Sequence, residues 1–480
     1  MKSNIRFIVI AAIVLLILGG AAAALVLTAP KEEEETQEET VVESKLIFDK
    51  NPEDIVKIAV KNEFGEYDID RIQSGEVSAW TVLDYVDAPL DGTFINNALE
   101  ESATLTASKT VTENAEDLSI YGLTEPRAEY TVSFSDSAST EVNVKIGDPV
   151  PGSQVYSYMS MGEGKVVFTV KTSDVGFALE DSRSCVNKTV FTQKTPENED
   201  DKTDYSLFKT LTVKRSDLDY DVVIEYDTRL DDENSIVSNS TSYRMTSPVT
   251  LDLNPDKCSG VITGMFGLTA SDFAEIKPAD ISKYGLDEPR LTVTADTNSG
   301  EFSLIIGGKA ENGGYYGMAG GIDMVYIFDE ASLPWLTFDT LDITANIIMS
   351  HYIFNIDTID IDYSGKSVGF ELLGEGADDF GVKESGKELD AEAFKKLYQF
   401  ILGAPSEQLY FGEVSGEPDV RISVKASDGN DVLEFYKTEN RRSVIVLNGK
   451  PSFTCTSAYV DRLIENVQKY LDGEEMITNW

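Results

Sequence analysis

The feature of this sequence that most constrains its fold is a segment that occurs twice. Residues 117–127 read DLSIYGLTEPR and residues 280–290 read DISKYGLDEPR, so eight of the eleven positions are identical. The strand-like segments after the two copies also correspond, because AEYTVSF and EVNVKIGD after the first match LTVTA and EFSLIIGG after the second. Self-similarity of this kind indicates an internal repeat. We therefore expect the same structural unit to be built at least twice.

The repeated segment has the residue order of a joint between a helical turn and a strand. Its aspartate is typical of an N-cap, whose side-chain oxygen accepts the free N–H groups of the next four residues. Its glycine suits the left-handed C′ position, the leucine after it supplies the contact of a Schellman motif, and its proline prevents the helix from resuming. The tyrosine can bury its ring and keep its hydroxyl near water. These structural residues are Asp117, Tyr121, Gly122, Leu123 and Pro126 in the first copy, and Asp280, Tyr284, Gly285, Leu286 and Pro289 in the second.

A binding role for the repeats is the alternative interpretation. It would depend on Arg127 and Arg290, because cations are uncommon in so acidic a chain. Tyrosines on the strands after each copy could form an aromatic binding face, although tyrosines on strands more commonly pack in cross-strand pairs. The tyrosines concerned are Tyr156, Tyr158, Tyr315 and Tyr316.

The hydrophobic pattern predicts an α+β fold of tandem, β-rich repeat units with short helices. Apolar and polar residues alternate in the segments after each copy, as in half-buried strands. The turns KIGD and IIGG are expected to be hairpin connections in which Gly147 and Gly307 adopt positive φ. A third, degenerate copy begins near residue 351, retains only the Glu-Pro of the motif, and has helical periodicity at 390–402 and 457–471. The predicted boundaries are 1–30 for a transmembrane anchor, 31–45 for an acidic linker, and 46–195, 204–350 and 351–480 for the three repeat units.

The N-terminal segment predicts a membrane anchor. Residues 7–27 contain no charge, and a helix of that length just spans a hydrocarbon core of about 30 Å. Lys2 and Arg6 precede the apolar run and a block of four glutamates comes after it, so we expect a cytoplasmic N-terminus and an extracytoplasmic body at the cell membrane. A cleaved signal peptide is the alternative, since the alanines at 21–24 could form a cleavage site.

The charge and the inventory of reactive residues exclude several functions. A formal net charge of −44 repels phosphate backbones, so nucleic acid is a poor partner. The three cysteines, Cys185, Cys258 and Cys455, are far apart and are expected to be buried hydrophobic residues. The one histidine, His351, is expected to be structural, and so few cysteines and histidines cannot form a zinc cluster. We therefore expect no enzyme and no cofactor, because 84 acidic residues single out no catalytic carboxylate pair.

The order of a YGLxEP segment, a strand, an IG turn, a tyrosine-containing strand and a closing helix resembles the bacterial envelope family catalogued as domain of unknown function 4340. The resemblance implies an N-terminal membrane anchor and proximity to permease or auxiliary subunits of ABC transporters, of the kind linked to gliding-motility export. It supplies no catalytic residues. The resulting hypothesis is a non-enzymatic, extracytoplasmic scaffold or binding protein that assists an ABC-type transporter. The alternatives are a cell-wall glycan-binding module that uses Tyr156 and Tyr315, and a hydrolase with an unrecognised carboxylate pair.

Overall fold

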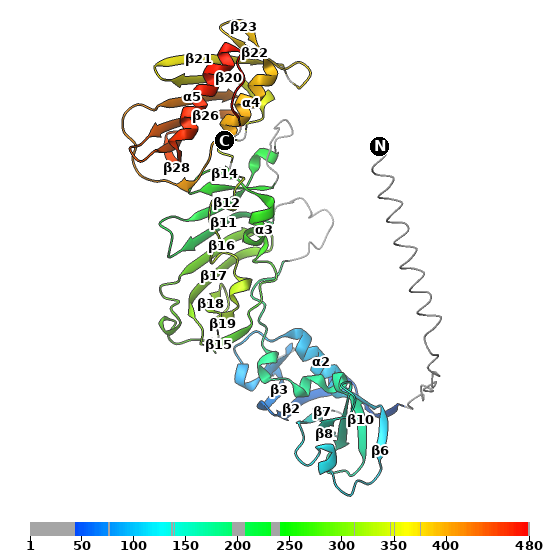
Figure 1. Ribbon diagram of the computed structural model, residues 1–480. Helices are drawn as coiled ribbons and strands as arrows, with labels where there is room; N and C mark the ends of the chain where they lie inside the picture. Colours follow the sequence, from blue (N-terminus) through cyan, green and yellow to red (C-terminus); the bar gives the residue numbers. More distant parts are fainter. Residues whose placement is uncertain are drawn as a thin grey trace, which may run out of the picture. The chain divides into compact units, whose positions relative to one another are not determined.

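The computed structural model describes residues 44–478, apart from 75–76, 136–137, 139, 194–206, 232–240, 312, 346, 350 and 375. The described residues form two compact bodies (Figure 1). The N-terminal body contains the described residues up to Asp84 together with Gly92–Cys185, and the C-terminal body contains Tyr85–Asp91 and the described residues from Val186 onward. The predicted anchor at 1–30 and most of the predicted linker lie outside the described residues. Within them, no helix has the length and apolar character needed to cross a membrane.

The N-terminal body is built on an antiparallel sheet, in which the described strands have the order β4-β3-β2-β7-β8-β9-β10-β6. A separate pair is formed by β1 (Lys45–Asp49) and β5 (Thr104–Ala107), and the body also contains helix α2 (Gly92–Ala103). The strands of the sheet are β2 (Ile55–Asn62), β3 (Gly65–Ser74), β4 (Val77–Val82), β6 (Lys109–Thr112), β7 (Ala128–Phe134), β8 (Glu141–Pro149), β9 (Tyr156–Met161) and β10 (Val167–Lys171).

The C-terminal body contains two further antiparallel sheets. The second sheet has the order β14-β13-β12-β11-β16-β17-β18-β19-β15 and is accompanied by α3 (Pro255–Thr263). Its strands are β11 (Phe208–Arg215), β12 (Val222–Tyr226), β13 (Tyr243–Ser247), β14 (Leu251–Asp252), β15 (Asp272–Ile276), β16 (Leu291–Thr297), β17 (Gly300–Lys309), β18 (Tyr315–Ala319) and β19 (Met324–Phe328).

The third sheet has the order β23-β22-β21-β20-β25-β26-β27-β28-β24, with helices α4 (Ala391–Leu402) and α5 (Ser457–Asp472). Its strands are β20 (Ile356–Tyr363), β21 (Lys366–Leu373), β22 (Gly381–Glu384), β23 (Lys387–Leu389), β24 (Gln408–Leu409), β25 (Val420–Ala426), β26 (Gly429–Lys437), β27 (Arg442–Leu447) and β28 (Lys450–Thr456). The described 3-10 helices of the chain are η1 (Pro52–Asp54), η2 (Leu83–Tyr85), η3 (Ser119–Tyr121), η4 (Thr172–Leu179), η5 (Ser182–Cys185), η7 (Thr228–Asp231), η8 (Ser282–Tyr284), η9 (Glu330–Ser332) and η10 (Ile353–Asn355).

All three sheets have one topology. The chain runs outward from the middle of the sheet to one edge, passes through a helix, adds the strand at the opposite edge, and then returns to the middle. The pairing of β2 with β7, of β11 with β16, and of β20 with β25 closes this return in each sheet. The β-rich, repeat-like architecture expected from the sequence is therefore confirmed, and the degenerate third copy has the strand order of the second.

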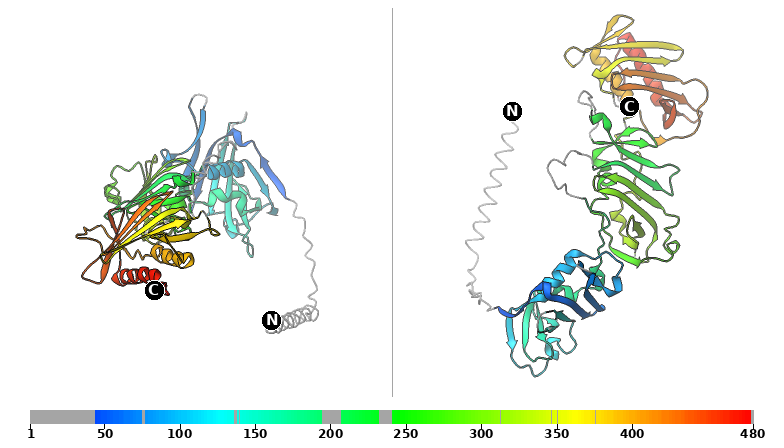
Figure 2. Two further views of the ribbon diagram at one scale, coloured as in Figure 1. Left: turned by 90° about the horizontal axis from the view of Figure 1, so that it is seen from above. Right: turned by 180° about the vertical axis from the view of Figure 1, so that it is seen from behind.

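Each sheet buries one face and exposes the other. In β7 every second residue is buried, as alternation of side chains across a pleated strand requires. The two long helices predicted for the third copy cover its buried face (Figure 2). Phe394 of α4 packs in tilted orientations against Phe370 of β21 and Tyr470 of α5. Asp390 caps α4 by accepting a hydrogen bond from Ala393 N at 3.0 Å. The second and third sheets share one continuous hydrophobic core.

Candidate functional site

The first repeated segment is a helix-to-strand joint, as the sequence predicts. Asp117 Oδ1 accepts a hydrogen bond from Ser119 N at 2.8 Å, so the aspartate satisfies a free N–H group of the turn. Gly122 has φ 67° in the left-handed region. Leu123 N donates to Leu118 O at 3.1 Å and Gly122 N donates to Ser119 O at 3.0 Å, which is the bonding pattern of a Schellman motif. The turn is a three-residue 3-10 helix with Leu118 at the N-cap, so the prediction of Asp117 as the N-cap is wrong by one residue and the helix is one residue shorter than expected.

The second copy repeats this geometry bond for bond. Ser282 N donates to Asp280 Oδ1 at 2.9 Å, and Gly285 has φ 67°. Leu286 N donates to Ile281 O at 3.2 Å and Gly285 N donates to Ser282 O at 2.9 Å. After Pro126 and Pro289 the chain enters β7 and β16 respectively. The two segments therefore adopt the same backbone structure.

Gly147 and Gly307 were expected to adopt positive φ in hairpin turns, and this prediction is wrong. Both residues lie inside strands, β8 and β17, and neither has positive φ. An added Cβ on Gly147 would overlap the carbonyl oxygen of Tyr121, and one on Gly307 would overlap the carbonyl oxygen of Tyr284. These positions require glycine because the backbone of the YGL turn lies directly against the strand. In each of the two repeats, the backbone of the YGL turn therefore packs against the glycine of the strand.

The third sheet lacks both the YGL turn and the glycine against which the turn packs. Ile146 and Ile306 pair with the first residues of β7 and β16, and Phe435 occupies the corresponding position opposite β25. The residue after it, which corresponds to Gly147 and Gly307, is Tyr436. A tyrosine there leaves no room for the turn, and the third copy has no YGL segment. The YGL turn and the strand glycine are thus lost together, which explains why the motif is degenerate in this repeat.

The tyrosines near the joint pack on each other. Tyr121 lies edge-on to Tyr158 with ring centroids 5.0 Å apart, and Tyr284 lies edge-on to Tyr316 at 4.8 Å. The hydroxyl of Tyr284 donates to Glu275 Oε2 at 2.7 Å. These contacts partly bury the four rings, which agrees with the structural interpretation of the tyrosines.

The residues named for a binding role are divided between the two bodies. Tyr315 is only 6% exposed, and the side chains of Arg290 and Lys309 lie over its ring at 5.0 and 5.4 Å from the centroid. Its faces are therefore not open for stacking on a ligand. Arg127 and Tyr156, in the N-terminal body, are both partly buried.

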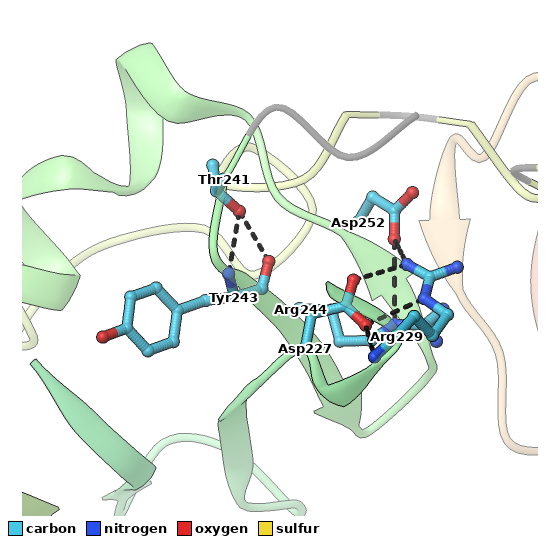
Figure 3. Close-up of polar contacts among 6 residues, drawn as sticks. All are labelled: Asp227, Arg229, Thr241, Tyr243, Arg244 and Asp252. Atoms are coloured by element: carbon cyan, nitrogen blue, oxygen red, sulfur yellow. Dashed lines mark hydrogen bonds and ion pairs between the residues drawn. The ribbon is translucent and has the colours of Figure 1, made fainter. Parts of the chain in front are cut away.

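A different group of charged residues lies at the β12–β14 edge of the second sheet, and the sequence analysis did not single it out (Figure 3). The side chain of Asp227, which comes directly after β12, is 1% exposed. Arg229 donates to it through Nε at 2.8 Å and Nη2 at 2.7 Å, and Nη2 also donates to Asp252 Oδ1 at 3.0 Å. The hydrogen bonds with Asp227 raise the pKa of Arg229 above its usual value. Arg229 is thus fully engaged as a structural cation.

Arg244 lies beside this pair and has poorer contacts. Its side chain is 24% exposed, and its Nε is 3.7 Å from Asp252 Oδ1, which is too far for a hydrogen bond. Burial lowers the pKa of Arg244, and the charge of Arg229 lowers it further. The carboxylates of Asp252, Asp227 and Asp431 act in the opposite direction without cancelling the shift. The guanidinium of Arg244 is therefore a cation with too few acceptors around it.

Strand register places Glu225 directly opposite Arg244 in the pairing of β12 with β13. The same register continues to Thr210 on β11 and to Asp252 on β14, so these side chains form a polar row across four strands. A pocket of about 590 Å³ opens over the row. Its lining is Lys209, Thr210, Glu225, Tyr226, Asp227, Thr228, Arg229, Asp231, Arg244 and Thr246.

His351 lies where the chain enters the third sheet and is structural, as expected. Its Nδ1 is 2.8 Å from Asp428 Oδ1 and its Nε2 is 3.0 Å from Asp431 Oδ2. The interaction with Asp431 raises the pKa of His351, burial opposes the rise, and Asp428 adds to it. Burial raises the pKa of Asp431, but hydrogen bonds from His351 and Asn448 outweigh burial and lower it. The imidazolium is thus held between two carboxylates.

This arrangement predicts a pH dependence of stability. Because the pKa of His351 is raised by folding, its contribution is fully present below its unfolded pKa of about 6.5 and is lost as pH rises through the folded pKa. We expect the free energy of unfolding of the C-terminal body to fall over that interval, and the fall to be smaller in His351→Gln. Urea unfolding of the full chain at several pH values measures this. An identical pH profile in the two proteins would contradict the prediction.

Other candidate chemistry is not assembled in the described part of the chain. Cys185, Cys258 and Cys455 are buried, as expected, and among the described residues they form no disulfide. Burial raises the pKa of Cys258 to about 11 and that of Cys455 to about 12, so neither thiol is activated. Among the residues that the structure describes, no group of three or more His, Cys, Asp or Glu could hold a metal ion.

The polar row could have been found only in part from the sequence. Alternation in VVIEY and YRMTS places Glu225 and Arg244 on outward-facing positions of adjacent strands. The pairing register could not be inferred, because residues 227–242 separate β12 from β13 and a connection of that length permits several registers.

Comparison with known proteins identifies a family and no individual relative. No curated protein and no solved structure matches the chain. The family model described as "Domain of unknown function (DUF4340)" matches residues 80–206 and 244–403, and each matched segment includes one copy of the YGL joint. These two segments cover more than half of the chain, and it therefore belongs to the family described as "Domain of unknown function (DUF4340)".

Proposed function

We propose that this protein is a non-enzymatic, membrane-anchored extracytoplasmic binding protein that serves as an accessory to an ABC-type transporter complex. The observation that carries the binding function is the pocket over the polar row, where Glu225 and Arg244 present opposite charges at the rim of about 590 Å³ of space. Pockets of about 300–1,000 Å³ with a few convergent polar groups are typical of ligand sites.

The surrounding residues support binding in preference to catalysis. The described cysteines are buried, and His351 is held in an ion pair with Asp428 and Asp431. A nucleophile needs an adjacent base that is free to accept its proton. The repeated YGL joint supports a structural role, because both copies lock a turn onto a strand through backbone contact.

The membrane anchor and the transporter partner rest on the N-terminal sequence and on the family resemblance. Residues 7–27 are apolar, and the positive charges precede them. Such a segment would hold the two folded bodies on the outer side of the membrane, within reach of a permease.

Affinity purification tests the transporter partner. The full chain, tagged at its C-terminus, would be recovered from native membranes in mild detergent and its associates identified by mass spectrometry. We expect a permease or an auxiliary transporter subunit with the native chain. The matched control is residues 1–43 fused to an unrelated exported domain, which should recover neither. Intact protein that recovers no transporter subunit would contradict the proposal.

Glycan binding is a weaker candidate because of the geometry of the tyrosines. Tyr315 is covered by two cationic side chains, which leaves Tyr156 as the remaining tyrosine of the two proposed platforms. Binding of the chain to cell-wall glycans that is lost in Tyr156→Ala would favour this function. Turnover of a glycan or peptide panel would instead favour a hydrolase with a carboxylate pair.

A further inference from the structure

The guanidinium of Arg244 lacks the contacts that a partly buried arginine normally has. Arginine carries five N–H donors, and buried donors without acceptors are costly. Within the described residues, the Nε atom of Arg244 is buried and has no hydrogen-bond partner. Its nearest carboxylate, Asp252, already accepts from Arg229 at 3.0 Å. The site therefore holds a cation whose donors have an incomplete set of acceptors.

The carboxylate of Glu225 is the second charged group at this site that lacks a full set of contacts. It is partly buried and faces Arg244 across the strand pair. Opposite charges at such positions commonly form a cross-strand ion pair, since directly opposite Cβ atoms lie about 4.5–5.5 Å apart. In the part of the chain that the structure describes, neither residue is within ion-pair distance of the other: the salt bridge of Arg244 is to Asp252. A charge of each sign is thus left facing the pocket at neighbouring positions.

We propose that this pocket binds a compact zwitterion, an α-amino acid, whose carboxylate accepts hydrogen bonds from Arg244 and whose ammonium donates to Glu225. This inference rests on the proposed binding function and names its ligand class. The two charges of an α-amino acid are separated by one carbon atom, so one small ligand can contact both members of the cross-strand pair Glu225 and Arg244. The hydroxyl groups of Thr210, Thr228 and Thr246 line the same pocket and supply neutral donors and acceptors for the rest of the ligand.

The charge of the whole molecule favours a zwitterion over a simple anion or cation. A net charge of −44 repels anions over long range, whereas a ligand with no net charge is not repelled. The pocket lining carries three basic side chains (Lys209, Arg229 and Arg244) and three acidic ones (Glu225, Asp227 and Asp231), so a ligand with one charge of each sign suits it better than a simple ion. A zwitterion would give Arg244 a hydrogen-bond acceptor and Glu225 a donor without adding net charge to the site.

Isothermal titration calorimetry on the full chain tests the inference. The probes are glycine, L-glutamine, L-phenylalanine and L-lysine, and then the N-acetyl and the amide derivatives of whichever binds most tightly. We expect binding of at least one amino acid. We expect the N-acetyl derivative, which lacks the ammonium, and the amide, which lacks the carboxylate, each to bind at least about tenfold more weakly.

Two variants locate the site. Arg244→Gln and Glu225→Gln should each weaken binding at least about tenfold, because each removes one charge-assisted contact. Lys214→Gln is the matched control: Lys214 is 59% exposed, pairs with Asp221, and is outside the pocket lining, so its affinity should equal that of the native chain. Thermal unfolding of each variant separates lost affinity from lost folding.

Three results would overturn the inference. They are no binding of any of the four amino acids, equal binding of the N-acetyl derivative, or native affinity in both Arg244→Gln and Glu225→Gln. The calorimetric test of the ligand can be distinguished from the affinity-purification test of the transporter partner. Recovered transporter subunits without amino-acid binding would refute the ligand class alone, and amino-acid binding without transporter subunits would refute the partner alone.

Discussion

Replacing Gly147 with alanine is expected to destabilise the N-terminal body by about 3 kcal/mol, which is at the upper end of the usual cost of overpacking. An added Cβ would overlap the carbonyl oxygen of Tyr121 and approach the side chain of Leu123 to 3.1 Å. The carbonyl belongs to a backbone turn held by the Schellman hydrogen bonds of Gly122 and Leu123, so it cannot rotate out of the way. Either the turn must detach from β8 or the strand must shift and lose sheet hydrogen bonds.

Hydrogen exchange on the full chain measures this effect where it occurs. We expect the amides of β7 and β8 to lose about 100-fold of their protection in Gly147→Ala, since 1.4 kcal/mol corresponds to a factor of ten. Gly176→Ala is the control in the same body, because nothing lies within 4 Å of an added Cβ there and its φ is not in the left-handed region. Equal protection in the two variants would show that the turn does not depend on the strand contact.

Removing the carboxylate of Asp227 is the second change with a large expected effect. In Asp227→Ala the guanidinium of Arg229 loses its bonds at 2.8 and 2.7 Å and keeps one to Asp252 at 3.0 Å. Breaking a buried ion pair by removing one partner costs about 3–5 kcal/mol, because the remaining charge is left uncompensated. We expect a loss of about 3 kcal/mol, at the lower end, since Asp252 still compensates Arg229 in part.

The double variant Asp227→Leu with Arg229→Met distinguishes loss of a charge partner from loss of packing. It removes both charges and should restore much of the stability lost in Asp227→Ala. Lys214→Ala should change stability by at most about 1 kcal/mol, because Lys214 and Asp221 form an exposed pair. Urea unfolding and hydrogen exchange of β12 and β13 report the differences. A double variant as unstable as the single one would assign the loss to packing around Asp227.

The joint at 117–127 was predictable because its interactions are short in sequence. Asp117 binds the N–H group two residues later, and the Schellman bond from Leu123 reaches back five residues. Residue type and spacing therefore define the geometry without knowledge of the rest of the chain. Helix α4 was predictable for the same reason, since its cap at Asp390 and its apolar spacing are both local.

The requirement for glycine at position 147 could not be explained from the residues next to it in the sequence. The IG pair resembles a hairpin turn, and a turn glycine is normally explained by positive φ. Its actual constraint is the carbonyl of Tyr121, which lies 26 positions earlier in the chain and reaches β8 only after the sheet has formed. The duplicated sequence showed that both glycines matter, and the packing showed why.

The candidate binding site depends still more on tertiary structure. Glu225 and Arg244 become neighbours through the register of β12 with β13, and Asp252 joins them through β14. With 84 acidic and 40 basic residues in the chain, composition offers far too many possible pairs to choose among them.

Repetition of a β-rich unit, the end of a helical turn and the start of a strand at each YGL copy, and the scarcity of cysteine and histidine could all be inferred from the amino-acid sequence. These conclusions depend on periodicity, composition and contacts between residues a few positions apart. The packing of the turn onto a glycine of a distant strand, and the shared pocket of Glu225 and Arg244, became evident only in the folded chain. The physical reason is that strand register and backbone packing bring together residues whose separation in sequence carries no local signal.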